Sequence, residues 1–293
     1  LARLEVGGGT LHTNMNPWRL ASASAAPRVS AGGGITLAAG ALLSLYSAPA
    51  AEPEPWGAFL RVTNALTLEN GSALQLYSHP VAAGSPRVEA GTVRVLAGAA
   101  IDASGKGYGG APKLALTNAG FGPGAGIGDS NSGMGGGHGG WGGGSYFNFT
   151  GGAAYGGADA PVLAGSGGGR FGTAGGAAGG GCVRLVARHV MVNGTVTAQG
   201  GKGVGPGGAG GAVFVTCEAL SGTNGAILVS GGDSTQPYSG GGGGGRLALF
   251  VDSAAQAAAG VPSIVFDAAP GASGASLKKD YPLRLADLGT LWF

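Results

Sequence analysis

The chain has 293 residues, of which 67 are glycine; only 10% are charged and the net charge is +2. This charge excludes the basic stripe with which proteins neutralise a nucleic-acid backbone. Glycine costs an interior helical position about 1 kcal/mol relative to alanine, so its abundance excludes a mainly helical protein. The 44% hydrophobic content suffices for one elongated domain, and we expect a single domain at 1–293.

The N-terminal part, 1–104, contains a recurring phrase of strand, tight turn and strand. Its four copies lie at 4–9, 35–40, 66–71 and 93–98, and each ends in a turn glycine. Apolar residues alternate within each copy, which predicts strands with one buried face. A unit of about 30 residues, the spacing of these copies, cannot bury that face alone and must stack on its neighbours. We therefore expect Leu37 to lie above Leu68.

A glycine-rich insertion at 105–181 interrupts the repeat. Disorder is one interpretation of such a segment. The other is an ordered, polyglycine-II-like layer, in which backbones without side chains approach closely and hydrogen-bond to one another. Aromatic residues that can pin loops to a scaffold favour the ordered layer. The aromatics that we expect to anchor the loops or make contacts are Trp141, Phe147, Phe149, Tyr155 and Phe171.

The repeat returns at 182–252, where two copies end at Gly194 and Gly225, at the same spacing as before. Three further strands follow glycine runs and share one column of alternating apolar residues, which begins at Val183, Val213 and Leu247. Shorter glycine runs at 200–211 and 231–245 follow the same strand of the repeat as the insertion does. All three glycine segments are therefore expected to emerge side by side at one corner.

The last part, 253–293, is predicted to be a C-terminal cap or a docking strand. It begins with an alanine-rich stretch at 253–260 that predicts one or two helical turns. Its end alternates apolar and polar residues, which fits either a capping strand or a strand that docks on a neighbouring molecule. The candidate assembly residues are Leu283, Leu285, Leu288, Leu291, Trp292 and Phe293.

The spacing of the copies predicts an all-β fold, a right-handed parallel β-helix with long glycine-rich loops at one corner. A β-sandwich is the alternative, but a sandwich does not require its strands to recur at a constant spacing. An open stack with uncharged ends also suits head-to-tail self-association, a contact that grows into fibres because it does not close.

Several glycine-rich motifs carry a family resemblance. They are IDASGKGYGG at 101–110, GMGGGHGGWGGGS at 133–145, GGGCVRLVARHVMVNGTVTAQGGKG at 179–203 and GGGGGGRLALF at 240–250. Together they resemble the glycine-rich parallel β-helix repeat proteins of bacterial and protist cell surfaces, over roughly 93–252. The resemblance implies an extracellular, adhesive or structural role, and it identifies an architecture better than an activity.

No catalytic, cofactor or metal site is predicted, because the 14 acidic residues are scattered singly. Enzymes that cleave polysaccharides need paired carboxylates or acids clustered around calcium. Asp129 begins half of a calcium loop, but the later bidentate acid is absent and polar turn chemistry explains the motif equally well. His138 is expected to be a loop hydrogen-bonder. We expect no enzyme but a structural or adhesive module; the alternative is a carbohydrate-binding or carbohydrate-cleaving protein.

The sequons at Asn70, Asn148 and Asn193 are candidate glycosylation sites and fit an extracellular or cell-surface location. The expected partners are a second copy of the chain or cell-surface glycans. The chain begins without methionine and shows no signal-peptide pattern, so we expect a processed segment. It also lacks an apolar run long enough to cross a bilayer, and we therefore expect no membrane span.

The two cysteines are predicted to be unbridged. Aligning the glycines that precede their strands places Cys182 beside Ala212 and Cys217 beside Ala187. The cysteines then lie five positions apart along the strand, about 16 Å at the usual rise per residue, which is too far for a disulfide. Cys217 is expected to point into the core.

Overall fold

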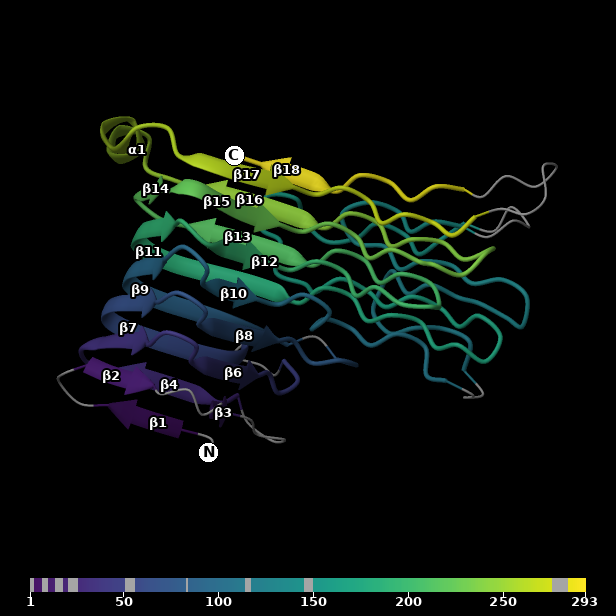
Figure 1. Cartoon of the computed structure of the whole chain (residues 1–293), viewed down its shortest axis with the longest axis horizontal. Helices are drawn as coiled ribbons and strands as arrows, with labels where there is room; N and C mark the ends of the chain where they lie inside the picture. The colour runs from purple at the N-terminus through teal and green to yellow at the C-terminus, as the bar shows by residue number, and fades with distance from the viewer. Residues whose placement is uncertain are drawn as a thin grey trace.

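A computed structural model describes the chain at 3–6, 10–13, 18–20, 26–50, 56–82, 84–113, 117–144, 150–275 and 284–293. In these residues the protein is all-β, with two parallel sheets and a single short helix. The strands are stacked one above another, and long loops extend from one side of the stack (Figure 1). We call the two sheets together the strand stack.

Sheet A has 11 strands and sheet B has seven, and every pairing within them is parallel. Sheet A contains β1 (Arg3–Val6), β2 (Thr10–Thr13), β4 (Arg28–Ala31), β5 (Gly34–Leu37), β7 (Trp56–Leu68), β9 (Ser85–Val95), β11 (Cys182–Val192), β13 (Ala212–Thr216), β14 (Ala219–Ser221), β16 (Arg246–Phe250) and β18 (Thr290–Trp292). Sheet B contains β3 (Trp18–Leu20), β6 (Leu42–Tyr46), β8 (Ala73–Tyr77), β10 (Ala100–Asp102), β12 (Thr195–Thr197), β15 (Thr223–Leu228) and β17 (Ser263–Asp267). The chain therefore returns to each sheet once per repeat.

The predicted register of the repeat is confirmed. Leu37 in β5 lies beside Leu68 in β7. Gly40 and Gly71 occupy equivalent turns with φ of 77° and 74°, a left-handed conformation that favours glycine. The two turns are stacked directly, because the Gly40 amide donates to the carbonyl of Asn70 at 3.2 Å.

The alignment predicted for the first copy of the repeat is wrong. Aligning 4–9 with 35–40 pairs Leu4 with Ile35, whereas the structure pairs Leu4 with Val29 and Leu11 with Ile35. The strand that matches β5 is therefore β2. In the sequence the glycines at 7–9 precede a strand, as the glycines at 32–34 do, so they are not equivalent to the turn glycine that ends the later copies.

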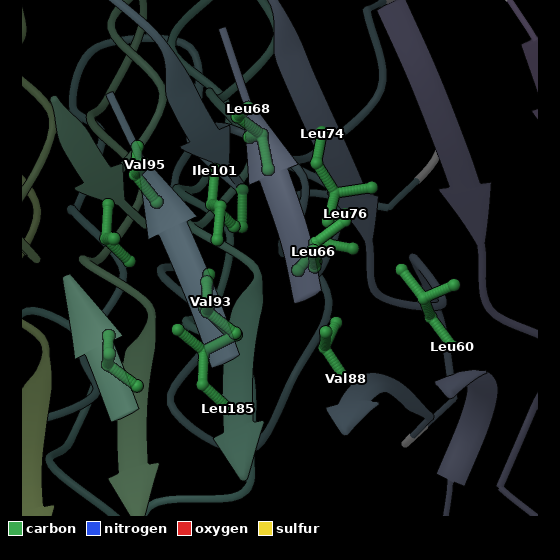
Figure 2. Packing of buried hydrophobic residues seen from close by; sticks show 14 of the residues in the cluster. Leu60, Leu66, Leu68, Leu74, Leu76, Val88, Val93, Val95, Ile101 and Leu185 are labelled. Atoms are coloured by element: carbon green, nitrogen blue, oxygen red, sulfur yellow. The ribbon is translucent and has the colours of Figure 1, made fainter. Parts of the chain in front are cut away.

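The core lies between the sheets and consists of side chains from successive strands (Figure 2). Leu68 in β7 lies beside Val95 in β9, and Leu74 in β8 lies beside Ile101 in β10, so the core is a set of apolar columns. Burying one such side chain stabilises the fold by about 1.5–3 kcal/mol. The fully buried members around these columns are Leu66, Leu68, Leu74, Leu76, Val93, Val95 and Ile101.

The described parts of the three glycine segments, 105–181, 200–211 and 231–245, extend from the same side of the strand stack and lie side by side (Figure 1). We call their described residues the glycine layer. Backbone hydrogen bonds join the segments: the amide of Gly136 donates to the carbonyl of Gly207 at 3.0 Å, and that of Gly210 donates to Gly243 at 2.9 Å. Most of these glycines are buried, so the segments satisfy each other's backbone groups in place of water.

Glycine is required in this layer because backbones approach too closely for a side chain. A Cβ atom added to Gly242 would lie 1.9 Å from the carbonyl oxygen of Gly208, and one added to Gly136 would lie 2.3 Å from that of Ser166. These are backbone atoms of neighbouring segments, which cannot rotate away as a flexible side chain can. The glycine content is therefore a packing requirement.

The predicted helical turns are confirmed as α1 (Ser253–Ala259). Asp252 caps its start, because its Oδ1 accepts a hydrogen bond from the amide of Ala255 at 2.8 Å. Gly260 ends the helix with a φ of 84°.

The cysteine prediction is also confirmed. Cys182 and Cys217 are free and buried, and Cys182 lies beside Ala212 as the glycine alignment predicts. Cys217 belongs to the hydrophobic core. Burial raises the pKa of the Cys217 thiol to about 11, so this group stays protonated at neutral pH.

Candidate functional site: the C-terminal end of the strand stack

Both sheets end at the C-terminal side of the stack with an open edge. β18 is the last strand of sheet A and pairs with β16; β17 is the last strand of sheet B and pairs with β15. Within the described residues neither strand has a partner on its other side. An open edge offers unpaired backbone donors and acceptors to another strand.

Most of the exposed large apolar side chains of the described chain belong to its C-terminal part, residues 250–293. Val265 on β17 is 63% exposed and Phe293 is 67% exposed. A concentration of exposed apolar residues marks an interaction surface more reliably than single exposed residues do. The set consists of Phe250, Val261, Val265, Leu285, Leu288, Leu291, Trp292 and Phe293.

An apolar groove of about 440 Å³ lies in this end. Its lining includes Leu249, Val251, Val261, Phe266 and Phe293. The rings of Phe266 and Phe293 meet edge to face, with their centroids 5.2 Å apart. The groove thus joins sheet B, through Phe266, to the C-terminal residues.

Helix α1 forms one wall of this groove. Its Gln256 is held against β14, because Oε1 accepts from the amide of Leu220 at 2.7 Å and Nε2 donates to the carbonyl of the same residue at 3.0 Å. Leu220, Gln256 and Ala257 all line the groove. Because these two hydrogen bonds of Gln256 hold the helix against β14, this wall of the groove is in place before anything binds.

Five of the predicted assembly residues are exposed: Leu285, Leu288, Leu291, Trp292 and Phe293. Leu283 lies outside the described residues.

Two further contributors to this end, β17 and the turn before it, are absent from the sequence prediction. Val261 in that turn is 97% exposed, and Val265 lies on β17. The apolar run in SIVFD at 263–267, directly after a helix that ends in glycine, is the signal that would have identified this strand.

A polar cluster, distinct from the apolar C-terminal end, lies where the glycine layer meets sheet A. His138 is fully buried, and its Nδ1 donates to the carbonyl of Gly210 at 2.9 Å. Its ring packs on Tyr155 with centroids 4.9 Å apart, while Nε of Arg246 donates to the Tyr155 carbonyl at 2.8 Å. Burial, with a smaller contribution from the charge of Arg246, lowers the pKa of His138 to about 4. His138 is a loop hydrogen-bonder, as predicted.

The predicted anchoring aromatics differ in their surroundings. Tyr155 is held on both sides, because its hydroxyl donates to the carbonyl of Ala164 and accepts from Ser166. Trp141 is 41% exposed, so its ring is only partly packed. Phe171 is partly buried in a tight turn. Phe147 and Phe149 lie outside the described residues.

The sequons also differ. Asn70 is exposed at a turn between stacked repeats. Asn193 is half-buried, and its Oδ1 accepts a hydrogen bond from the amide of Thr223 at 2.8 Å. Asn148 lies outside the described residues. Asn70 is therefore the described sequon whose side chain is most accessible.

Asp102, Asp129 and Asp233 are engaged in local structure. Asp102 forms an ion pair with Lys106, and Asp233 pairs with Lys202 at 2.9 Å. Oδ1 of Asp129 accepts from the amides two and three positions later, both at 2.7 Å, which is the polar turn chemistry considered above. In the described parts of the chain, no three His, Cys, Asp or Glu side chains gather closely enough to hold a metal ion.

Among the helices that the structure describes, none has the length and apolar character needed to cross a membrane. Comparison of the chain with family models, with curated proteins and with solved structures finds no match in any of the three. The function must therefore be argued from the residues and their geometry.

Proposed function

We propose that the two parallel sheets form a right-handed parallel β-helix. The support is that the chain alternates between sheets A and B and returns to each in parallel register, one repeat later. Crossover connections between parallel strands are right-handed in nearly all proteins, which supports the handedness. The glycine layer fits polyglycine-II packing, because it is held by backbone hydrogen bonds between stretches of chain that are far apart in sequence, such as those from Gly136 to Gly207 and from Gly210 to Gly243.

We further propose that the protein is an extracellular structural module that assembles head to tail into a surface fibre and has no enzymatic activity. The observation that carries this proposal is the apolar C-terminal end, with its groove and its two open strand edges. The low charge and the exposed sequon at Asn70 support an extracellular setting. The engagement of the acids in turns and ion pairs supports the absence of catalysis.

The proposed occupant of the C-terminal end is the first repeat of a second copy. At the other end of the stack, β1 and β3 are the terminal strands of sheets A and B, so they also leave open edges within the described residues. Placing these strands on β18 and β17 would continue both parallel sheets. Because this contact joins two different surfaces, every added copy presents the same free end again and growth does not close.

The test is the state of association of the full chain. We expect filaments by negative-stain imaging and a sedimentation coefficient that rises with protein concentration. The double variant Val265→Asp, Phe293→Asp is expected to remain monomeric, because it places charges in the contact. Val204→Asp, which changes a valine that is 62% exposed in the glycine layer, is the control and should assemble normally. A protein that stays monomeric at every concentration, or filaments that survive the double substitution, would refute the proposal.

A further inference from the structure

Two arginines lie side by side on the outer face of sheet A. Arg87 in β9 and Arg184 in β11 are register partners, with Val88 and Leu185 next to them in the core. Because side chains alternate along a strand, the two guanidinium groups point away from the core on neighbouring strands. Two like charges directly opposite each other repel, so their pairing needs an explanation.

Both guanidinium groups stack on the ring of Trp56, which begins β7. The Cζ atom of Arg87 lies 4.4 Å from the ring centroid and that of Arg184 lies 4.9 Å from it. The indole holds both cations in fixed positions through cation–π contacts. Stacking of this kind leaves the in-plane N–H donors of arginine available for an anion.

The charge of Arg184 is buried and incompletely paired. The residue is 6% exposed; its Nη2 donates to the carbonyl of Val162 at 3.2 Å, while Nε and Nη1 have no hydrogen-bond partner. In the described chain no carboxylate lies within ion-pair distance of it. The neighbouring Cys182 thiol interacts with Arg184, but burial raises the pKa of this thiol, so Cys182 is a neutral partner and not an anion. A buried cation with unpaired donors is costly without an anionic partner.

Arg87 has one carboxylate partner, Glu89, and its Nε is also unpaired. Glu89 lies two positions further along the same strand and, in the described chain, pairs with Arg87 and not with Arg184. The Arg87 and Glu89 side chains are each 26% exposed, so solvent and solutes reach this ion pair.

The arginines line two adjoining cavities on this face. The smaller, of about 140 Å³, is lined by Trp56, Arg87, Val162, Arg184 and Phe214, among others. A groove of about 440 Å³ continues along the strands and is lined by Arg61, Glu89, Gly91, Val186 and Arg188, among others. Val186 belongs to both linings. Together they contain four arginines and one glutamate, a local charge of +3 in a protein whose net charge is +2.

We propose that this face binds the carboxylate or sulfate groups of an acidic polysaccharide, with one anionic group in the smaller cavity beside Arg87 and Arg184 and the next ones along the groove toward Arg61 and Arg188. Arginine donors in a fixed fork match the paired oxygens of both groups. Trp56 supplies apolar surface in the same lining. The two linings hold four arginines, whereas a nucleic acid would require contacts to many successive phosphates.

The polysaccharide site is separate from the proposed assembly contact. It lies on the outer face of sheet A, and its lining shares no residue with that of the C-terminal groove. The variant Val265→Asp, Phe293→Asp, which is designed to be monomeric, should therefore keep the polysaccharide affinity of the native chain. The two proposals can thus fail separately.

The experiment is calorimetric titration of the full chain with polygalacturonate, dextran sulfate and neutral dextran at low salt. We expect one or both acidic polymers to bind and dextran not to bind; the tighter of the two identifies carboxylate or sulfate as the recognised group. Arg87→Gln and Arg184→Gln should each weaken binding about tenfold or more, since charge-assisted hydrogen bonds are lost. Arg94→Gln, an exposed position on the same strand as Arg87, is the control with the same change of charge and should weaken binding less than about twofold.

Thermal unfolding of each variant accompanies the titrations. If Arg184→Gln does not fold, Arg87→Gln decides, because that side chain is partly exposed. The proposal is overturned if neither acidic polymer binds, or if Arg94→Gln weakens binding as much as the other two variants. It is also overturned if single-stranded poly(U) binds more tightly than either polysaccharide and Arg87→Gln weakens that binding to the same extent.

Discussion

The strand stack and the glycine layer differ in how they bury the chain and pair its backbone. Both contain few charges, and in both the buried backbone donors and acceptors need hydrogen-bond partners. In the stack, the sheets pair the backbone and apolar columns such as Leu37 and Leu68 fill the space between them. In the layer few side chains fill the space; segments approach until the carbonyl oxygen of Gly208 would be 1.9 Å from a Cβ on Gly242.

This difference has consequences for energetics. Removing part of a side chain from the stack leaves a cavity, whereas the layer has few side chains to remove and is sensitive to the addition of one. The stack should tolerate exchange between apolar residues of similar size. In the layer, any exchange at a close approach should cost stability, because only glycine lacks a Cβ. Three substitutions can test this contrast, from the largest expected effect to the smallest.

The largest effect is expected in the stack. Leu74→Ala should destabilise the fold by about 2–5 kcal/mol, because the side chain is fully buried and its removal leaves a cavity. The measurement is the midpoint of urea unfolding. The control is Leu285→Ala at a position that is 71% exposed, which should change stability by less than about 0.5 kcal/mol. Equal effects of the two substitutions would contradict the assignment of the core.

The second effect concerns His138, the buried titratable group that joins the layer to the stack. Its pKa is lowered to about 4 in the folded protein, while an unfolded chain has the ordinary value of 6.5. The unfolded state therefore binds more protons between these values, and stability is lost as the pH falls from 6.5 toward 4. One pKa unit corresponds to about 1.4 kcal/mol, so the loss should reach about 3 kcal/mol.

The variant His138→Gln removes this titration while keeping an amide that can donate to the Gly210 carbonyl. We expect the wild-type protein to lose clearly more stability than the variant when urea unfolding is compared at pH 7.5 and pH 4.5, a window set by the two pKa values. If both proteins lose the same amount, His138 is not the group that titrates in this window.

The register of the stack was predictable because it depends on local signals. A turn glycine with a left-handed φ, such as Gly40, recurs at a nearly constant spacing, and alternation fixes which side chains point inward. The position of Cys182 beside Ala212 follows from a second local signal, the glycines that directly precede the two strands. The exception is the first repeat, where the strand that matches β5 is β2 and not the one predicted at 4–9.

The burial of the arginines on the outer face of sheet A was not predictable from such local signals. The alternation places Arg184 and Arg246 on the outer face, which would normally be exposed. Segments of the insertion cover them instead, and the carbonyls of Val162 and Tyr155 accept their hydrogen bonds. The insertion has no sequence repeat like that of the strand stack, so its path follows from long-range glycine packing and not from a local pattern. Arginine at the same point of successive repeats, as in RVE at 87–89 and RLV at 184–186, was the available signal.

The smallest effect, and the most direct test of the contrast, is the addition of one methyl group to the layer. Gly242→Ala places a Cβ at 1.9 Å from the Gly208 carbonyl oxygen and 2.4 Å from its carbon, so two backbone segments must move apart. Overpacking of this kind costs about 1–3 kcal/mol. Gly157→Ala is the matched control in the same layer, because its nearest neighbour would be the flexible carboxylate of Asp159 at 3.1 Å and the next atoms lie 4.0 Å away.

Hydrogen exchange is the measurement that separates local from global effects in this pair. If the layer is a close-packed unit, Gly242→Ala should speed exchange of the Gly210 and Gly136 amides, which donate to neighbouring segments, while the amides of β7 and β9 stay protected. Gly157→Ala should leave both sets unchanged. Rapid exchange of the layer amides already in the wild-type protein would mean that the layer is not held by its backbone hydrogen bonds. If exchange of the Gly210 and Gly136 amides is slowed or unchanged in Gly242→Ala, the segments have room for a side chain. Close approach would then not be the reason for glycine at this position.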